Sequence, residues 1–212
     1  MRHTALGKGA LKQIPPMIRR RFSALGKVAV SAALPILSNC QSIPSVFASR
    51  HGDAALTLSL LNDIAKDEPM SPTGFSLAVH NAVSGLFSIA RKDFSEITSI
   101  AAMEGLVLQA LLEAVAQLQD RERILCVIYD VPLPEFYDCD SDPFPYAIAL
   151  VISHTEGLPF TLEQDCSADE GSLLPAPFDT EPLQFIGLLA GCYSELNTKL
   201  NGVSWRIKRV GQ

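Results

Sequence analysis

Short apolar runs of strand length alternate along this chain with longer segments in which apolar residues recur at helical spacing. The runs span residues 46–49, 75–79 and 124–129, and a helical segment lies between each pair. This alternation is typical of parallel strands, because each crossover between them needs a long connection, usually a helix. We therefore expect an α/β fold with a mixed, mostly parallel sheet and helices on both of its faces.

The ends of several segments can be predicted from single residues. Pro15 and Pro16 precede a helix that is expected to run to Pro35. Asp53 is the expected N-cap of a second helix, and Asn81 or a neighbour caps a third. Later patterns predict a helix over about 101–119 and a hairpin of strands 146–153 and 158–163. A further helix is expected to open at Thr180 and Pro182, with Leu196 on its apolar side, and a last strand is expected over 203–208. Residues 146–212 would then complete or extend the fold.

Composition indicates one folded domain with apolar surface left to cover. With 212 residues the chain can bury a core of its own, and we expect a single domain over residues 1–212. Charged residues make up 19%, below the usual quarter, while 48% are hydrophobic, so part of the surface is expected to lie against a partner. The net charge of −6 argues against nucleic-acid binding, which needs a basic face.

The cysteines indicate neither a zinc site nor a disulfide framework, since they are odd in number and lack Cys-x-x-Cys spacing. We therefore expect no metal and no cofactor. Free thiols fit a reducing compartment, and no run approaches the ~20 apolar residues that span a bilayer. A cytoplasmic protein without stable membrane insertion is expected. The five positions are Cys40, Cys126, Cys139, Cys166 and Cys192.

The most specific motifs lie in residues 71–90. Ser71-Pro72-Thr73-Gly74-Phe75 is followed by Val79-His80-Asn81-Ala82, which leads into Ala82-Val83-Ser84-Gly85-Leu86. Other pieces, in order along the chain, are Ile14-Pro15, Arg19-Arg20-Arg21-Phe22-Ser23, Val46-Phe47-Ala48-Ser49-Arg50-His51-Gly52 and Tyr129-Asp130-Val131-Pro132-Leu133-Pro134. Together, over about residues 14–134, they resemble the β-ketoacyl-synthase-like chain length factors of bacterial aryl polyene clusters. The resemblance implies the N-terminal half of a thiolase-like fold.

Enzymes of the thiolase-like superfamily carry a cysteine nucleophile at the N-terminus of a buried helix, after a strand and within patterns such as Cys-x-Ser-Gly-Leu. The resemblance places Ala82 at that position, with residues 75–79 as the strand. Backbone N–H groups and the helix dipole at such a site favour the thiolate, which attacks an acyl thioester. Alanine cannot attack, so the resemblance implies a subunit without catalysis. The family's catalytic histidines belong to a C-terminal half that we expect this chain to lack.

The resemblance also implies a full-length β-ketoacyl synthase as partner, in a heterodimer in which this chain shapes the synthase's acyl tunnel. The strand before the nucleophile helix pairs across the two-fold axis in thiolase-like dimers, which makes residues 71–81 the expected interface. The predicted interface and tunnel residues are Ser71, Pro72, Thr73, Phe75, Leu77, Val79, His80, Asn81, Ala82 and Phe87. Arg19, Arg20 and Arg21 would contact an acidic acyl carrier protein or the partner, or else form a solvated helix face.

Other interpretations remain open at this point. His80 and Asn81 are either a polar pair facing a partner or acyl chain, or a histidine satisfied by backbone groups beside a capping asparagine. The chain would instead be an acyltransferase or thioesterase if Cys192 or Ser84 were a nucleophile. A third possibility is a homodimeric protein that binds fatty-acyl chains.

Overall fold

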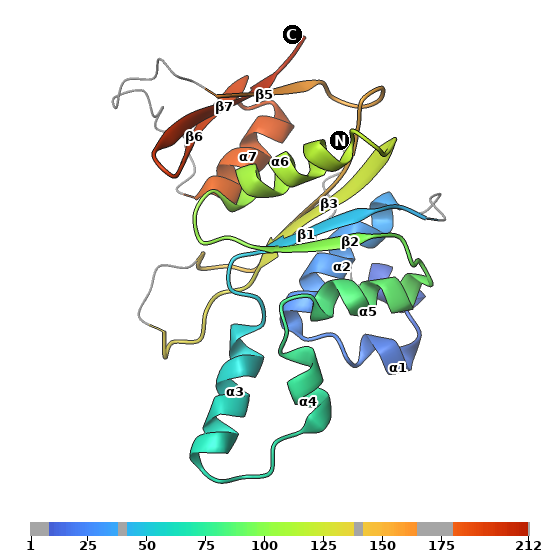
Figure 1. Ribbon diagram of the computed structural model, residues 1–212, viewed down its shortest axis with the longest axis vertical. Helices are drawn as coiled ribbons and strands as arrows, with labels where there is room; N and C mark the ends of the chain where they lie inside the picture. The colour runs from blue at the N-terminus through green and yellow to red at the C-terminus, as the bar shows by residue number, and fades with distance from the viewer. Residues whose placement is uncertain (1–8, 38–41, 138–141, 165–179, 212) are drawn as a thin grey trace.

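A four-stranded sheet forms the centre of the computed structural model, which describes residues 9–37, 42–137, 142–164 and 180–211 (Figure 1). The strands are β1 (Ser45–Ser49), β2 (Ile97–Ala101), β3 (Arg123–Asp130) and β4 (Tyr146–Ser153), in the order β2-β1-β3-β4. β1 is parallel to β2 and β3, and β4 is antiparallel to β3. The predicted mixed, mostly parallel sheet is confirmed.

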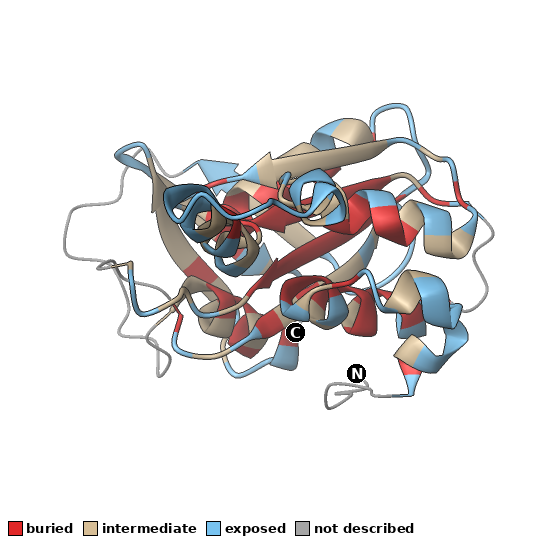
Figure 2. Ribbon diagram, turned by 90° about the horizontal axis from the view of Figure 1, so that it is seen from below, coloured by how far each residue is buried: buried red, intermediate tan, exposed pale blue. Residues whose placement is uncertain are grey.

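Helices cover both faces of this sheet. Val46 and Ala48 of β1 contribute to one buried layer and Phe47 to the other, because successive side chains of a strand alternate. The first layer contains α6 (Leu106–Gln117), and the second contains α2 (Ala24–Ile36) and α5 (Ala82–Arg91). Figure 2 shows the buried residues gathered in the sheet and on the sides of the helices that face it. Apolar contacts on both faces explain the continuous apolar runs of β1 and β3.

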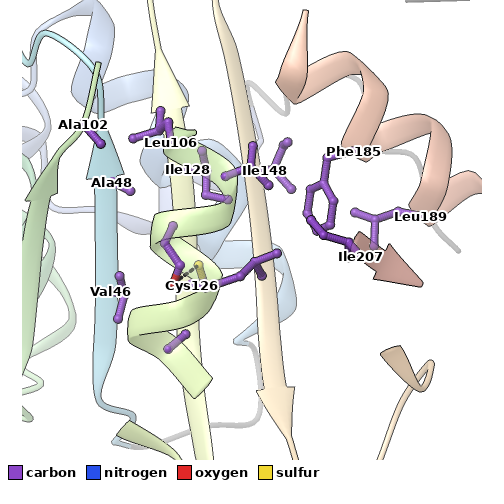
Figure 3. Close-up of a cluster of buried hydrophobic side chains, with 14 of the residues drawn as sticks. Val46, Ala48, Ala102, Leu106, Cys126, Ile128, Ile148, Phe185, Leu189 and Ile207 are labelled. Carbon is purple, nitrogen blue, oxygen red and sulfur yellow. Dashed lines mark hydrogen bonds between the residues drawn. The ribbon is translucent and has the colours of Figure 1, made fainter. Parts of the chain in front are cut away.

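A smaller antiparallel sheet extends the layer that contains α6. Its strands β5 (Phe160–Gln164), β6 (Glu195–Leu200) and β7 (Val203–Arg209) lie in the order β5-β7-β6. Between the two sheets lies α7 (Glu181–Ala190). Phe185 and Leu189 of α7 and Ile207 of β7 share one buried cluster with Leu106 of α6 (Figure 3).

The predicted hairpin of strands 146–153 and 158–163 is wrong, although both strands form. β4 pairs with β3 along its whole length, from Tyr146 opposite Asp130 to Ser153 opposite Arg123, while β5 pairs with β7. Pairing with a buried central strand stabilises β4 more than an isolated two-stranded hairpin would. The helix predicted from Thr180 ends at Ala190, because Gly191 adopts a left-handed conformation (φ +80°), and Leu196 lies in β6.

The helix predicted from Pro16 to Pro35 is also interrupted. A short 3₁₀ turn (Ala10–Gln13) and α1 (Pro16–Arg19) precede α2, which begins at a new cap. The Ser23 hydroxyl accepts a hydrogen bond from the Gly26 N–H at 3.3 Å. Phe22 packs against Gly26, where an added Cβ would lie 2.8 Å from the ring. The chain therefore turns between two helices so that Phe22 is buried.

Residues 75–79 do not form the predicted strand. Ser71 and Pro72 instead begin α4 (Pro72–Leu77), since the Ser71 hydroxyl accepts the Gly74 N–H and proline is favoured in a first turn. The preceding helix is α3 (Ala54–Ala65), and Asp53 caps it as predicted by accepting the Leu56 N–H at 3.1 Å. α3 and α4 extend away from the sheet (Figure 1). Within the described ranges, no helix is long and apolar enough to cross a lipid bilayer.

Candidate functional site

The predicted interface residues lie mostly on an exposed arm, defined here as residues 71–81, which comprises α4 and the turn after it. Phe75 is 62% exposed and Val79 is 53% exposed, although both are large and apolar. Ser71, Pro72, Thr73 and Asn81 are exposed as well, whereas Leu77, His80 and Ala82 are half-buried. Phe75 lies on α4 and Val79 in the turn after it, and exposed large apolar side chains this close in the sequence favour a contact with another molecule.

The predicted interface residue Phe87 lies elsewhere. Its side chain is 2% exposed and packs in the core, with its ring centroid 5.2 Å from that of Phe47. The periodicity of α5 accounts for this position, because Phe87 lies on the same helix face as the buried Val83. Phe87 therefore supports the sheet and offers no surface to a partner.

His80 ties the end of the arm to the sheet. Its Nε2 lies 2.7 Å from the backbone carbonyl oxygen of Ile100, which can only accept, so Nε2 carries the proton. The ring packs over Gly52, where an added Cβ would lie 3.0 Å from Nδ1. Asn81 starts α5 without a side-chain capping bond. This bond agrees with the interpretation of His80 as a histidine satisfied by backbone groups. Asn81 does not cap α5 by its side chain.

A strand that runs into a buried helix is found at a different place from the one predicted. α5 follows α4, not a strand, whereas α6 follows β2 through the segment Ala102-Met103-Glu104-Gly105, called here the α6 turn. Ala102 is 6% exposed and Leu106 is fully buried. Gly105 has φ +58°, a conformation that favours glycine. Ala102 to Leu106 has the same Ala-x-x-Gly-Leu pattern as Ala82 to Leu86, so the motif alone did not distinguish the two segments.

Polar side chains gather at the carboxyl ends of β1 and β3, the edge of the sheet at which β2 leads into the α6 turn. Asp130 accepts hydrogen bonds from the Ser49 hydroxyl at 3.2 Å and from the Arg50 N–H at 2.8 Å. Arg50 also lies 3.6 Å from Asp142 in an ion pair. Burial raises the pKa of the Asp130 carboxyl, although these hydrogen bonds act in the opposite direction. Sequence reasoning missed this cluster, whose members lie up to 93 positions apart, from Ser49 to Asp142.

Comparison with protein-family models gives a match to the β-ketoacyl synthase N-terminal domain over residues 2–206. The chain belongs to this family. Among solved structures, this β-ketoacyl synthase-like chain is similar to the ketosynthase ApeO in complex with its chain length factor ApeC from Xenorhabdus doucetiae. The identity is 28%, the TM-score is 0.76, and the alignment covers 93% of this chain and 82% of the other.

A second similar structure is the ishigamide ketosynthase/chain length factor, with 14% identity and a TM-score of 0.57. The alignment covers 76% of this chain and 54% of that one, and at this identity the likeness shows the shared fold alone. None of the curated proteins compared with this chain matches it. The comparisons confirm the resemblance to β-ketoacyl-synthase-like chain length factors and the thiolase-like half-fold.

The described cysteines and Ser84 of this synthase-like chain differ in their surroundings. Burial raises the pKa of the Cys126 thiol to about 12, so the thiol stays protonated near neutral pH. Cys192 is exposed just beyond α7. The Ser84 hydroxyl donates to the Asn81 carbonyl at 2.9 Å and lies 3.0 Å from the Ser99 hydroxyl, neither of which is a general base. Cys40, Cys139 and Cys166 lie outside the described residues.

The arginine run lies beside the arm. Arg20 and Arg21 are exposed and Arg19 is half-buried. Arg21, Leu77 and His80 border a small pocket of about 30 Å³, which has room for a water molecule or two but not for an acyl chain. No ion pair of the three arginines is found with the described residues. No group of three or more His, Cys, Asp or Glu in the described ranges is placed to hold a metal ion.

Proposed function

We propose that this chain is a non-catalytic, chain-length-factor-like subunit that pairs with a full-length β-ketoacyl synthase and shapes its acyl tunnel. The pathway would be the biosynthesis of aryl polyenes or related type II polyketides. The observation that carries the proposal is an alanine, Ala102, at the one strand-to-buried-helix turn of the described fold that fits the family's nucleophile position. The similarity to a ketosynthase and chain length factor complex supports it.

Within this proposal, Ala102 replaces Ala82 as the counterpart of the nucleophile. The family's cysteine lies after a strand and at the start of a buried helix, and the α6 turn meets both conditions. Ala82 follows a helix and begins α5, a helix with an exposed side. Both positions carry alanine, so the proposed loss of catalysis is unaffected by this choice.

The proposed interface combines the arm with the outer edge of β2. β2 lies at the end of the sheet and pairs with β1 alone among the described strands. An exposed strand edge offers backbone N–H and C=O groups to a strand of another chain. In thiolase-like dimers the strand before the nucleophile helix makes this contact, which β2 would do here. The exposed Phe75 and Val79 would then lie against the partner and close to its acyl tunnel.

Co-expression tests the pairing. A tagged full-length synthase from the same gene neighbourhood should retain this chain through affinity purification, and the pair should elute together on sizing. The double variant Phe75→Ala/Val79→Ala should weaken retention, whereas Leu158→Ala, at an exposed position between β4 and β5, should not. Elution of the chain as a stable homodimer in the presence of candidate synthases would contradict the proposal and favour an acyl-binding protein.

Incubation with an acyl thioester tests the absence of catalysis. Intact mass should show no acyl adduct on this chain while the partner synthase becomes acylated. An adduct on the wild-type chain that disappears in Cys192→Ala or Ser84→Ala would overturn the proposal and favour an acyltransferase or thioesterase.

A further inference from the structure

The N-terminus of α6 is occupied by a carboxylate from a distant part of the chain. Glu181, the first residue of α7, accepts hydrogen bonds from the Val107 N–H at 3.3 Å and the Leu108 N–H at 3.4 Å, one with each carboxylate oxygen. These N–H groups lie in the first turn of α6 and have no partner within the helix. Gly105 precedes the helix and has no side chain to cap it, so Glu181 takes this role.

In a synthase, the N-terminus of the helix at this position would stabilise a thiolate. A helix N-terminus lowers the pKa of a thiol beside it because its dipole and free N–H groups favour negative charge. In this chain the Glu181 carboxyl group already accepts the hydrogen bonds of these N–H groups, and in its ionised form it would repel a second anion. The hydrogen bonds from Val107 and Leu108 to Glu181 hold the start of α7 at the start of α6. Ala102, Leu106 and Phe185 belong to one buried cluster, in which Ile128 and Ile148 separate Phe185 from the other two in the view of Figure 3.

The surroundings of Glu181 include further charged and titratable groups. The positive charge of Arg50, which follows β1, lowers the pKa of the Glu181 carboxyl. The negative charge of ionised Glu181 in turn raises the pKa of the Tyr146 hydroxyl in β4. Burial raises the pKa of the Glu181 carboxyl, while the hydrogen bonds from Val107 and Leu108 lower it. The Glu181 carboxyl group is therefore held in place by hydrogen bonds to α6 and is not a solvated surface charge.

We propose that Glu181 blocks the α6 N-terminus against thiolates and other anions. The loss of catalysis in this chain would then have two parts: the thiol is missing, and an internal carboxylate occupies the helix N-terminus that would stabilise a thiolate. The inference rests on the proposed placement of the nucleophile position at Ala102, but not on pairing with a synthase. Restoring a cysteine would then not restore a reactive thiol unless Glu181 is also neutralised.

A simpler role for Glu181 must be separated from this one. A glutamate in a first helical turn stabilises its own helix, here α7, and a bond to α6 would clamp the two helices together. A clamp changes stability but does not change the ionisation of a thiol at residue 102. The test therefore needs a thiol pKa as its readout.

The experiment uses the full chain in three variants: Ala102→Cys, Ala102→Cys/Glu181→Gln and Ala102→Cys/Glu113→Gln. Glu113→Gln removes the same charge from α6, but two turns further along the helix. Alkylation of the thiol introduced at residue 102 by iodoacetamide is followed from about pH 6 to about pH 10 by peptide mass spectrometry, which reports the thiolate. The exposed Cys192 of the same molecule is the internal reference, and melting temperatures show that all three variants fold.

The introduced thiol should react roughly tenfold faster near pH 7 in the Glu181→Gln variant than with Glu181 present, the factor that a pKa change of one unit produces. The Glu113→Gln variant should behave like Ala102→Cys alone. Equal rates in the variants with and without Glu181, or no reaction in any of them, would overturn the proposal. So would an introduced thiol that reacts faster than Cys192 while Glu181 is present. A lower melting temperature without a change in the ionisation of the introduced thiol would show a helix clamp only.

Discussion

Two segments of this chain have the same Ala-x-x-Gly-Leu pattern and yet fold into different surroundings. Ala82 to Leu86 begins α5 after an exposed helix, and an added Cβ on Gly85 would meet nothing within 4 Å. Ala102 to Leu106 joins β2 to the buried α6, and an added Cβ on Gly105 would lie 3.3 Å from the Leu200 side chain. The comparison shows that two segments with the same five-residue pattern differ in the element that precedes them and in the side chains that cover them.

The difference separates two roles within one proposed interface. The arm before Ala82 exposes apolar side chains and is suited to contact another chain. The α6 turn lies inside the molecule, and its helix N-terminus is already bound by Glu181. We propose that the first segment binds the partner and that the second is the counterpart of the family's nucleophile turn without a reactive group.

The largest expected effect concerns the core beneath the α6 turn. Leu108→Ala removes a fully buried side chain and should lower the free energy of unfolding by about 2–5 kcal/mol. Leu61→Ala, at a 52% exposed position of α3, should change it by no more than about 0.5 kcal/mol. Urea denaturation of both variants measures the contrast. A similar loss in both would mean that α3 is packed as tightly as α6, and the comparison would fail.

The next effect concerns the arm as a binding surface. Phe75→Ala should weaken pairing with the synthase by about 2 kcal/mol, or roughly thirtyfold in Kd, because exposed aromatic residues are frequent hot spots of interfaces. Its effect on the unfolding of the isolated chain should be small. Titration of the labelled synthase measures Kd, with Leu158→Ala as the control. An unchanged Kd would remove the arm from the interface.

A smaller effect tests how the far end of α5 is anchored. Asp93, just beyond α5, accepts hydrogen bonds from the Ile43 N–H at 3.1 Å and from the Ser95 hydroxyl at 2.7 Å. Burial tends to raise its pKa, but these bonds and the nearby Arg91 outweigh burial, so the pKa lies below its ordinary value. Asp93→Asn should cost about 1–3 kcal/mol at neutral pH.

The sign of the pH dependence follows from the lowered pKa. The ionised Asp93 carboxylate stabilises the fold above the unfolded-state pKa, and this contribution is lost as the pH falls from about 4 toward the lower folded-state pKa. The stability gap between wild type and Asp93→Asn should therefore narrow in that acidic range. A gap that stays constant down to acid denaturation would show that the charge of Asp93 is not what stabilises this end of α5.

The smallest effect compares the two glycines directly. Gly105→Ala should destabilise the chain by about 1–2 kcal/mol, because alanine is strained at φ +58° and crowds Leu200. Gly85→Ala, inside α5 with open space beside it, should stabilise the chain by up to about 1 kcal/mol. Thermal unfolding of the matched pair gives both signs. The same sign for both substitutions would contradict the distinction between the two segments.

Local signals in the sequence predicted those features that depend on near neighbours. Asp53 caps α3 as expected, since its partner Leu56 is three residues away. The strands β1 and β3 were predicted because burial on both faces makes their sequences continuously apolar. β2 was missed because it is a half-buried edge strand, and residues 75–79 were assigned to a strand although Ser71 and Pro72 start a helix there.

The sequence by itself determined the α/β class, the family resemblance and the absence of a cysteine from both Ala-x-x-Gly-Leu segments, because each of these depends on residue types and short spacings. The tertiary structure alone decided which segment follows a strand, which strand pairs with β4, and which group binds the α6 N-terminus. Glu181 and Val107 are 74 positions apart, and no local pattern relates them. Contacts of that range form only when the chain buries its apolar surface, so they are properties of the packed fold.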